Sequence, residues 1–529
     1  MNKSASDPVA TTKSGVVRGS QAPGEGAVFA GIPFAAPPIG TLRFRPPQPP
    51  SPWPSTRDAT QFAPAPPQNR VMPPPGSGQA GTPGTAAGTE RGAALLAAAR
   101  QMAEVSSEDC LYLNVWTPSV QGRAPVLVWV YGGGFETGSA SPPKFDGAAV
   151  SRLLGAVVVA ANYRLGALGW LMPSGTDAAH WAHSANLGLQ DQAAALRWVR
   201  DNIAAFGGNP DNITVAGASA GAFSVGALLA LAGASGTFHK AALQSGSTAR
   251  VTPAKTATAV TRDLMSTLGV DSMAALQHVP LDQLLDAQRQ VVDNDLGTRW
   301  LPGGRGWGVV LDGQVLTRHP HYAVADGCAA GIPLLVGANR DEFRMFAALS
   351  GDTYRPSHEA QLRDEMTNAG VRRPSELVEA YRARLHDGSA VLPEPWDELH
   401  ELRTLFLTDA IYRAPATRLA DAQARAGGRA YSYLFTGEPF GPKGGAHHSA
   451  DGFYLLDKLG ALGIDTPEQR AVRHAYVGAW AKFVADGDPG WPTHDPKAAK
   501  PTRAIGTDAA PVDELPADVA EFWHEATWE

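Results

Sequence analysis

The sequence predicts an α/β protein with a mostly parallel central sheet that is flanked by helices and carries helical insertions. Short β-rich apolar runs alternate with helical stretches along the 529 residues, and this alternation is typical of helices packed on a parallel sheet. The apolar runs are nearly continuous, as expected for strands that are buried on both faces. The 57 Gly and 43 Pro residues indicate many turns and exclude a coiled coil.

The elements follow one another along the chain. A helix is expected over residues 190–206, because Leu196, Val199 and Ile203 recur at helical spacing and Gly207 ends the pattern. Six strands are expected, at residues 126–131, 156–162, 213–217, 241–244, 333–338 and 430–435.

Two regions between the later strands, about 252–330 and 352–430, have a mostly helical pattern and are expected to be elaborations of the sheet. No linker separates them from the strands. The sequence therefore predicts that residues 1–529 form a single domain.

Residues 63–106 are expected to form a flexible loop. Segment 63–89 is rich in Pro, Gly, Ala and Thr without periodicity, and an alanine-rich helical stretch, 93–104, follows it. A surface insertion and a lid over a site are both compatible with this composition.

Charge and cysteine content exclude several classes of protein. The chain has 44 basic and 51 acidic residues, a net charge of −7 and no basic block, so a nucleic-acid partner is not expected. The longest apolar stretches are far shorter than the roughly 18 residues of a membrane-spanning helix. The N-terminus lacks the apolar part of a secretory signal, which predicts a cytoplasmic location, although a processed secreted form would look the same. Cys110 and Cys328 could form at most one disulfide.

The strongest local motif is Gly217-Ala218-Ser219-Ala220-Gly221, which lies between the strand at 213–217 and an expected helical run. When a Gly-x-Ser-x-Gly sequence connects a strand to a helix, the serine occupies a sharp turn that exposes its hydroxyl. An ordinary glycine-flanked turn is the alternative, but this is the only Gly-x-Ser-x-Gly sequence in the chain. We therefore expect Ser219 to be a nucleophile.

A run of three glycines, Gly132 to Gly134, follows the strand at 126–131. Glycines let the backbone approach a substrate closely with its N–H groups exposed. We expect the N–H groups of Gly133, Gly134 and Ala220 to form an oxyanion hole. The run lacks the spacing of phosphate-binding loops, and no cofactor or metal ion is expected.

A serine nucleophile requires a base and an acid, which in this order of motifs follow later strands. Asp341 and Glu342 follow the strand at 333–338, and His447 and His448 follow the strand at 430–435. Position alone leaves both alternatives open.

Several ordered motifs resemble the type-B carboxylesterase and cholinesterase family along nearly the whole chain. The resemblance implies an α/β-hydrolase fold and hydrolysis of small-molecule carboxylic esters. The motifs are GIPFAAPPIG at 31–40, LRFRPP at 42–47, SEDCLYLNVW at 107–116, NYRLG at 162–166, NLGLQDQ at 186–192 and QSGS at 244–247.

Carried over to this sequence, the resemblance implies a catalytic triad of Ser219, Glu342 and His448. The family histidine precedes an acidic residue by three positions, here Asp451, which selects His448 rather than His447. Two further positions, Ser247 and Asp409, resemble supporting polar residues of the family. The implied mechanism is acyl transfer through an acyl-enzyme.

The departures from the family pattern are informative. Ala218 stands where the family usually has Glu, and Phe343 follows the acid where Gly is common. No residue upstream of Cys110 can provide the family disulfide, so the loop at 63–106 is expected to be untethered.

The segment between Trp53 and Trp116 holds no tryptophan, so the ring with which choline-ester enzymes bind a quaternary ammonium is missing. The sequence therefore predicts neutral or anionic esters as substrates in preference to choline esters. Trp300 and Trp307 could line an acyl pocket, although core packing is the simpler interpretation. The alternatives to an esterase are an amidase or carbamate hydrolase with the same triad, and a non-catalytic binding protein on the same fold.

Overall fold

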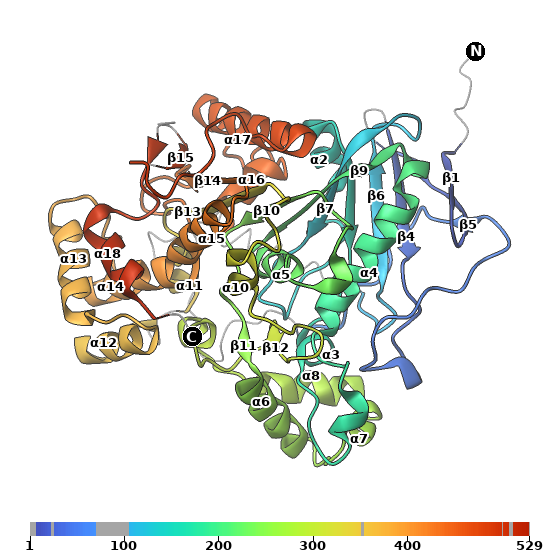
Figure 1. Cartoon of the computed structure of the whole chain (residues 1–529), viewed down its shortest axis with the longest axis horizontal. Helices are drawn as coiled ribbons and strands as arrows, with labels where there is room; N and C mark the ends of the chain where they lie inside the picture. The colour runs from blue at the N-terminus through green and yellow to red at the C-terminus, as the bar shows by residue number, and fades with distance from the viewer. Residues whose placement is uncertain are drawn as a thin grey trace.

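The computed structural model describes residues 7–22, 26–69, 105–350, 354–499, 501–506 and 511–527. Its centre is an 11-stranded sheet with the strand order β16-β15-β14-β13-β10-β9-β7-β8-β6-β4-β3 (Figure 1). Neighbouring strands from β15 to β8 are parallel, whereas β6, β4, β3 and β16 pair antiparallel at the two sides. The predicted α/β fold with a mostly parallel sheet is therefore confirmed.

The six strands expected from the sequence form the parallel part of the sheet. They are β7 (Ala124–Val130), β8 (Val157–Ala161), β9 (Gly208–Ala218), β10 (Lys240–Gln244), β13 (Leu334–Asn339) and β14 (Ala430–Phe435). Five of them lie within two residues of the expected bounds. Strand β9 begins at Gly208 rather than at 213, because Gly208 pairs with Ala124 of β7 ahead of a register shift, and the residues between Gly208 and Ile213 have no apolar pattern.

The strands that the sequence analysis did not identify are short or lie towards the sides of the sheets. Those in the large sheet are β3 (Ser20–Gln21), β4 (Ala27–Pro33), β6 (Tyr112–Thr117), β15 (Thr502–Ile505) and β16 (Pro511–Val512). Those in two small sheets are β1 (Val9–Thr12), β2 (Gly15–Arg18), β5 (Arg57–Asp58), β11 (Thr252–Pro253) and β12 (Val310–Leu311).

Helices cover both faces of the sheet (Figure 1). Helices α2 (Gly147–Leu154) and α17 (Pro467–Asp486) contact each other and pack on one set of strands. Helices α4 (Leu187–Asn202), α5 (Ala220–Leu228) and α15 (Ala414–Arg425) pack on the strands as a second group. The helix expected over 190–206 corresponds to α4 and the 3₁₀ turn Ile203–Phe206 that follows it.

The two expected elaborations are mostly helical. Region 252–330 contains α6 (Ala254–Thr267), α7 (Met273–Gln277), α8 (Leu281–Gln290), α9 (Leu296–Trp300) and α10 (Pro320–Ala325). Region 352–430 contains α12 (Glu359–Asn368), α13 (Pro374–His386), α14 (Glu398–Thr408), a π-helical turn (Asp409–Arg413) and α15. The remaining helices are α3 (Gly166–Trp170), α11 (Arg344–Ser350), α16 (Ala450–Leu455) and α18 (Ala517–Glu525).

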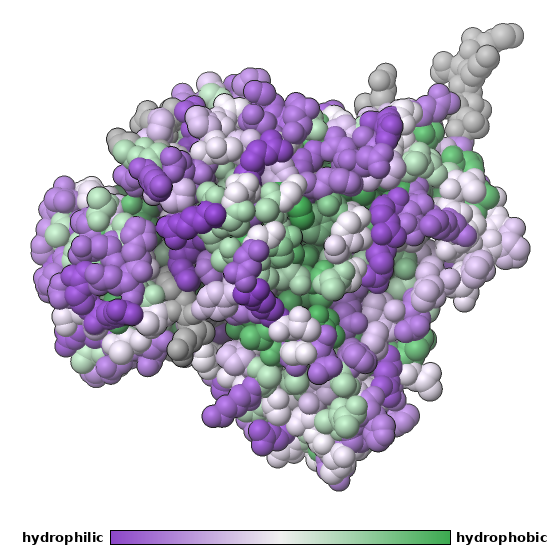
Figure 2. Space-filling model, in the orientation of Figure 1, coloured by the Kyte–Doolittle hydropathy of each residue, from purple (hydrophilic) through white to green (hydrophobic). Residues whose placement is uncertain are grey.

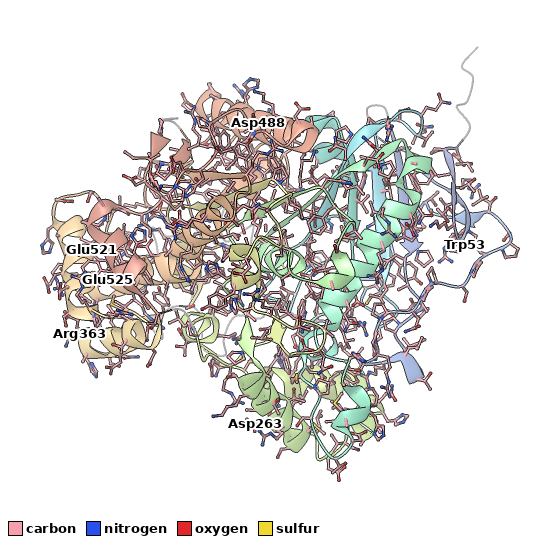
Figure 3. The ribbon with its side chains drawn as sticks, viewed as in Figure 1. Trp53, Asp263, Arg363, Asp488, Glu521 and Glu525 are labelled. Atoms are coloured by element: carbon pink, nitrogen blue, oxygen red, sulfur yellow. The ribbon has the colours of Figure 1, made fainter. Side chains whose placement is uncertain are left out.

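The second elaboration has a charged outer side. Arg363 of α12 and Glu521 of α18 lie at this side of the molecule (Figure 3). Hydrophobic residues gather nearer the middle of the same face (Figure 2). The organisation of residues 1–529 as one domain stays a prediction, although one hydrophobic cluster extends from Ala10 to Ala526.

The ends of the segment 63–106 lie together. Ala65 donates its N–H to the carbonyl of Val105 at 2.9 Å and accepts one from Ser107 at 3.0 Å. The expected helix at 93–104 and most of the expected loop lie outside the described residues. No described helix is long and apolar enough to cross a membrane. Both cysteines are free thiols, Cys110 buried and Cys328 exposed.

Candidate active site

Ser219 lies at the sharp turn between strand β9 and helix α5. Its backbone has φ 56° and ψ −125°, a conformation that a residue with a side chain rarely adopts and that costs about 1–3 kcal/mol. The Ser219 N–H donates to the carbonyl of Gln244 at 2.9 Å, which ties the turn to the end of the neighbouring strand β10. The side chain lies at the N-terminus of α5, where the helix dipole favours negative charge.

The glycines on either side of Ser219 permit close packing of the turn. A Cβ atom on Gly221 would lie 2.0 Å from the carbonyl oxygen of Val130, and one on Gly217 would lie 2.5 Å from Gly221 itself. Any larger residue would therefore force helix α5 away from strands β7 and β9.

The glycine run after strand β7 lies against the same turn. A Cβ atom on Gly132 would lie 2.7 Å from the Ala218 carbonyl oxygen and 3.0 Å from Ser219 Cβ. Among the described residues, no hydrogen bond uses the N–H of Gly133, Gly134 or Ala220. The three N–H groups assigned to the oxyanion hole are therefore available beside the serine.

Glu342 and His448 form a direct pair. His448 Nδ1 lies 2.6 Å from Glu342 Oε2, and both side chains are almost fully buried. The other Glu342 carboxylate oxygen accepts the N–H of Asn339 at 2.7 Å, and the His448 N–H donates to the Glu342 carbonyl at 3.1 Å. The acid and the imidazole are thus held together by both side-chain and backbone bonds.

The neighbouring residues Asp341 and His447 have other partners. Arg340 donates to Asp341 Oδ2 at 2.8 Å, and the N–H of Ala446 donates to the same oxygen at 2.9 Å. Burial raises the pKa of Asp341, but Arg344 and Arg340 outweigh it and bring that pKa to about 2. His447 Nδ1 lies 2.8 Å from the carbonyl oxygen of His448. Of the two alternatives that position left open, the structure brings Glu342 and His448 together.

The two supporting residues lie apart from the triad contacts. Ser247 Oγ accepts the N–H of Ala249 at 3.2 Å and so stabilises a turn. Asp409 accepts the Tyr381 hydroxyl at 2.8 Å and lies 3.3 Å from Arg413. These contacts place Ser247 and Asp409 in the structural framework, and within the described residues neither side chain forms a hydrogen bond with Ser219, Glu342 or His448.

Sequence reasoning missed a buried network behind the acid and base. Asp451 accepts the Asn339 amide at 3.2 Å, the Gln244 amide at 3.1 Å and the Tyr476 hydroxyl at 2.9 Å. Burial, followed by the charge of Glu342, raises the pKa of Asp451 to about 6. The sequence signal for this network is the position of Asp451 in the first turn of α16, directly after the histidine loop.

Other motif residues form buried ion pairs. Arg164 binds Asp191 through two bonds, Nη2 to Oδ1 at 2.7 Å and Nε to Oδ2 at 2.8 Å. Arg43 of the motif at 42–47 binds Glu108 of the motif at 107–116, with 2.7 Å between Arg43 Nε and Glu108 Oε2. These motif residues stabilise the fold around the site and do not contact the triad.

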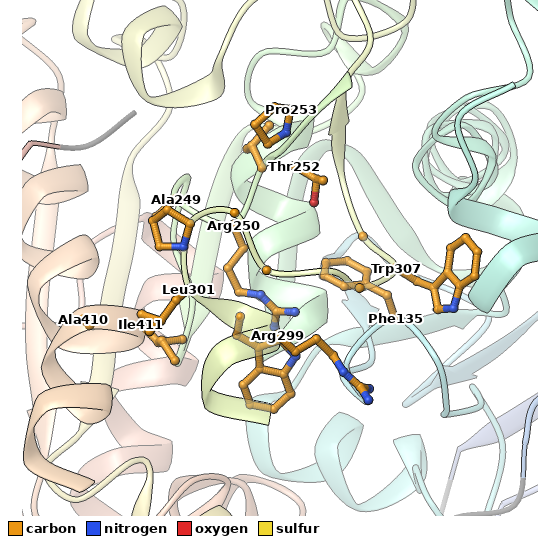
Figure 4. A pocket seen from close by; sticks show the side chains of 17 residues that line it. Phe135, Ala249, Arg250, Thr252, Pro253, Arg299, Leu301, Trp307, Ala410 and Ile411 are labelled. Carbon is orange, nitrogen blue, oxygen red and sulfur yellow. The ribbon is translucent and has the colours of Figure 1, made fainter. Parts of the chain in front are cut away.

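An aromatic wall surrounds His448. Its ring lies 5.0 Å from Phe346 and 4.9 Å from Tyr412, measured between ring centroids. Phe346 in turn lies 4.8 Å from Trp300, whose indole borders Gly134. Trp300 and Trp307 both line a cavity of about 90 Å³ beside this wall (Figure 4). Both tryptophans therefore line a pocket, and Trp307 is also buried in the core at 3% exposure.

No group of three or more His, Cys, Asp or Glu side chains within the described ranges could hold a metal ion. The arrangement instead combines a strained serine, a paired imidazole and carboxylate, and free N–H groups. Chemically, these groups suit nucleophilic attack on a carbonyl carbon with stabilisation of the resulting oxyanion.

Comparison with known proteins identifies the family. Residues 6–508 match the carboxylesterase family. The chain is 32% identical over 506 residues to the para-nitrobenzyl esterase of Bacillus subtilis (strain 168), covering 92% of both chains. It is 33% identical over 513 residues to the fumonisin B1 esterase of Sphingopyxis macrogoltabida, covering 92% of this chain and 84% of that one.

Solved structures agree with this assignment. A Geobacillus stearothermophilus carboxylesterase matches with a TM-score of 0.77 and 34% identity, covering 95% of this chain and 97% of its own. A para-nitrobenzyl esterase structure matches with a TM-score of 0.80 and 30% identity, covering 98% of this chain and 100% of its own. The chain therefore belongs to the type-B carboxylesterase family and is a carboxylesterase.

Proposed function

We propose that this protein hydrolyses carboxylic esters through an acyl-enzyme formed on Ser219. His448 accepts the Ser219 proton as the hydroxyl attacks the acyl carbon, and the N–H groups of Gly133, Gly134 and Ala220 stabilise the oxyanion. The tetrahedral intermediate collapses, and His448 returns the proton to the departing alcohol. Water then attacks the acyl-enzyme by the same route and releases the acid.

The observation that carries this proposal is the 2.6 Å contact between His448 Nδ1 and Glu342 Oε2. Because Nδ1 is committed to the carboxylate, Nε2 is the nitrogen left to exchange a proton with Ser219. Glu342 fixes this tautomer and stabilises the imidazolium that forms during attack.

Neutral or anionic esters are the proposed substrates, in preference to choline esters. The segment between Trp53 and Trp116 offers no indole for cation–π binding of a quaternary ammonium. The proposal predicts a lower kcat/KM for butyrylcholine than for uncharged alkyl or aryl butyrates.

Titration with a fluorophosphonate tests the nucleophile directly. One equivalent is expected to inactivate the protein and to appear on the peptide that contains Ser219, whereas Ser219→Ala should bind none. Absence of labelling on the folded protein would favour a non-catalytic binding protein.

Matched substrates separate an esterase from an amidase or carbamate hydrolase. We expect p-nitrophenyl butyrate to be hydrolysed much faster than the corresponding anilide and N-alkyl carbamate. Faster turnover of either of these would instead assign the same triad to amide or carbamate cleavage.

A further inference from the structure

The cavity beside the aromatic wall contains a guanidinium group that has no anionic partner in the part of the chain that the structure describes. Arg250 follows strand β10 and lines the cavity, and Figure 4 shows its guanidinium beside Phe135. Its Nη1 atom is buried and has no hydrogen-bond partner among the described residues. A buried charged group without a partner is costly, so this arrangement requires an explanation.

Three aromatic rings surround the Arg250 guanidinium. The Cζ atom lies 4.7 Å from the ring centroid of Trp300, 5.0 Å from Phe223 and 5.4 Å from Phe135. Cation–π contacts stabilise the charge but accept no hydrogen bonds. The rings therefore hold the guanidinium in place while leaving Nη1 without a hydrogen-bond acceptor among the described residues.

The other arginine of the cavity shows the contrast. Arg299 also lines it, but Arg299 Nη1 lies 2.8 Å from Glu136 Oε1, and its Nε donates to the Asp293 carbonyl. Glu136 is thus already paired. Burial lowers the pKa of Arg250 to about 10, so Arg250 is charged at neutral pH.

The aromatic cage connects Arg250 to the reacting groups. Phe135 directly follows Gly134, and a Cβ atom on Gly134 would lie 3.8 Å from Trp300 Cζ2. Phe223 lies one helical turn beyond Ser219, to whose carbonyl its N–H donates at 3.0 Å. The guanidinium therefore lies next to the residues that flank the oxyanion hole and the nucleophile.

We propose that Arg250 binds a carboxylate of the substrate, so that the preferred esters carry a second, anionic group a few atoms from the scissile bond. This inference rests on the proposed esterase function and specifies its substrate class. A carboxylate would satisfy the free guanidinium donors through charge-assisted hydrogen bonds, and a cationic substrate would be repelled. The cavity volume of about 90 Å³ exceeds the roughly 10–15 Å³ that one water requires, so it has room for a small charged group.

The carboxylate could lie on the acid or the alcohol half of the ester, and two substrate pairs distinguish them. Monoethyl glutarate is compared with ethyl 5-methylhexanoate, and the acetate ester of 4-hydroxybutanoate with 4-methylpentyl acetate. In each pair an isopropyl group replaces the carboxylate at nearly constant shape. The readout is the ratio of kcat/KM for the charged to the uncharged member.

Arg250→Met is expected to lower this ratio about 10- to 100-fold for one pair, the range for a hydrogen bond to a charged group. Arg250→Lys should lower it less, because the charge is retained. Arg305→Met is the control, since it removes an arginine that pairs with Asp263 and does not line the cavity, and its ratio should change less than threefold. A ratio that stays within threefold in Arg250→Met for both pairs, or an equal fall in the two methionine variants, would overturn the proposal.

A binding measurement separates this inference from the esterase proposal. Glutarate is expected to raise the Tm of the intact protein but not that of Arg250→Met, with folding of each variant checked by its Tm without ligand. If fluorophosphonate labels Ser219 but glutarate does not raise the Tm and the kcat/KM ratio does not change in Arg250→Met, the protein is an esterase without an anion pocket. A glutarate effect without labelling would leave an anion pocket without the esterase.

Discussion

Replacing Glu342 by Gln tests the acid assignment most sharply. Glu342 uses both carboxylate oxygens as acceptors, one for the Asn339 N–H at 2.7 Å and one for His448 Nδ1 at 2.6 Å. Gln has one oxygen, so its NH₂ group must face one of these two donors. If the amide oxygen keeps the Asn339 bond, His448 must accept at Nδ1 and carry its proton on Nε2, where it cannot act as a base.

The expected loss is large because both tautomer and charge stabilisation are affected. For an acid held in this way, removal of the charge costs about 10⁴-fold in kcat, or roughly 5.5 kcal/mol of transition-state free energy. The assay is kcat for p-nitrophenyl butyrate, normalised by fluorophosphonate titration. A fall of less than about tenfold in Glu342→Gln would refute the assignment.

Asp341→Asn is the matched control, because the two carboxylates are adjacent in the chain. Asp341 binds Arg340 and the Ala446 N–H rather than an imidazole, so kcat should fall less than tenfold. Its pKa of about 2 lies below the unfolded value near 3.8, so its contribution to stability is present above pH 4 and is lost as the pH falls towards 2. At pH 7 the variant should therefore lose roughly 2 kcal/mol of stability. A loss of kcat equal to that of Glu342→Gln would contradict the distinction between the two residues.

Three further predictions concern the base, the elbow and the framework. His448→Ala should abolish turnover while His447→Ala retains most of it in the same assay; the reverse result would exchange their roles. Ser219→Gly should end labelling and turnover but raise Tm by about 1–3 °C. Glycine relieves roughly 1–3 kcal/mol of backbone strain at φ 56°, and the Tm of a chain of this length shifts by about 1 °C per kcal/mol. A fall in Tm would argue against strain at this position. Asp191→Asn leaves the buried Arg164 without its ion pair and should lower the free energy of unfolding by about 3–5 kcal/mol. Calorimetry should then show a fall in Tm of about 3–5 °C. An unchanged Tm would show that the ion pair does not stabilise the fold.

The sequence was sufficient to predict the parallel strands of the sheet and the sharp turn at Ser219. Strands β7 and β8 are continuously apolar, and Gly217 and Gly221 are required by the close approach of α5 to the sheet, so local pattern and final structure agree. Strand β9 was only partly predicted, because pairing with β7 rather than residue type sets its polar beginning.

The acid and base could not be chosen from position alone. Asp341 and Glu342 differ in which way their side chains point, and this depends on Arg340, Arg344 and the loop around Ala446, which are brought together only by the fold. The sequence could not show that Arg250 Nη1 lacks a hydrogen-bond partner among the described residues, because the fold decides which acceptors reach it. Contacts between distant segments, rather than propensities, decide such features.

The different burial of the two thiols has a practical consequence. Burial raises the pKa of the Cys110 thiol far above its ordinary value, and Cys110 is completely enclosed, whereas Cys328 is exposed. Since the thiolate is the reactive form, a maleimide should attach at Cys328 alone without any substitution. Cys328 Sγ lies 3.5 Å from the carbonyl oxygen of Leu229, at the far end of α5 from Ser219. A fluorophore there would sit about 15 Å from the nucleophile along the helix axis, close enough to report on ligands that enter the site.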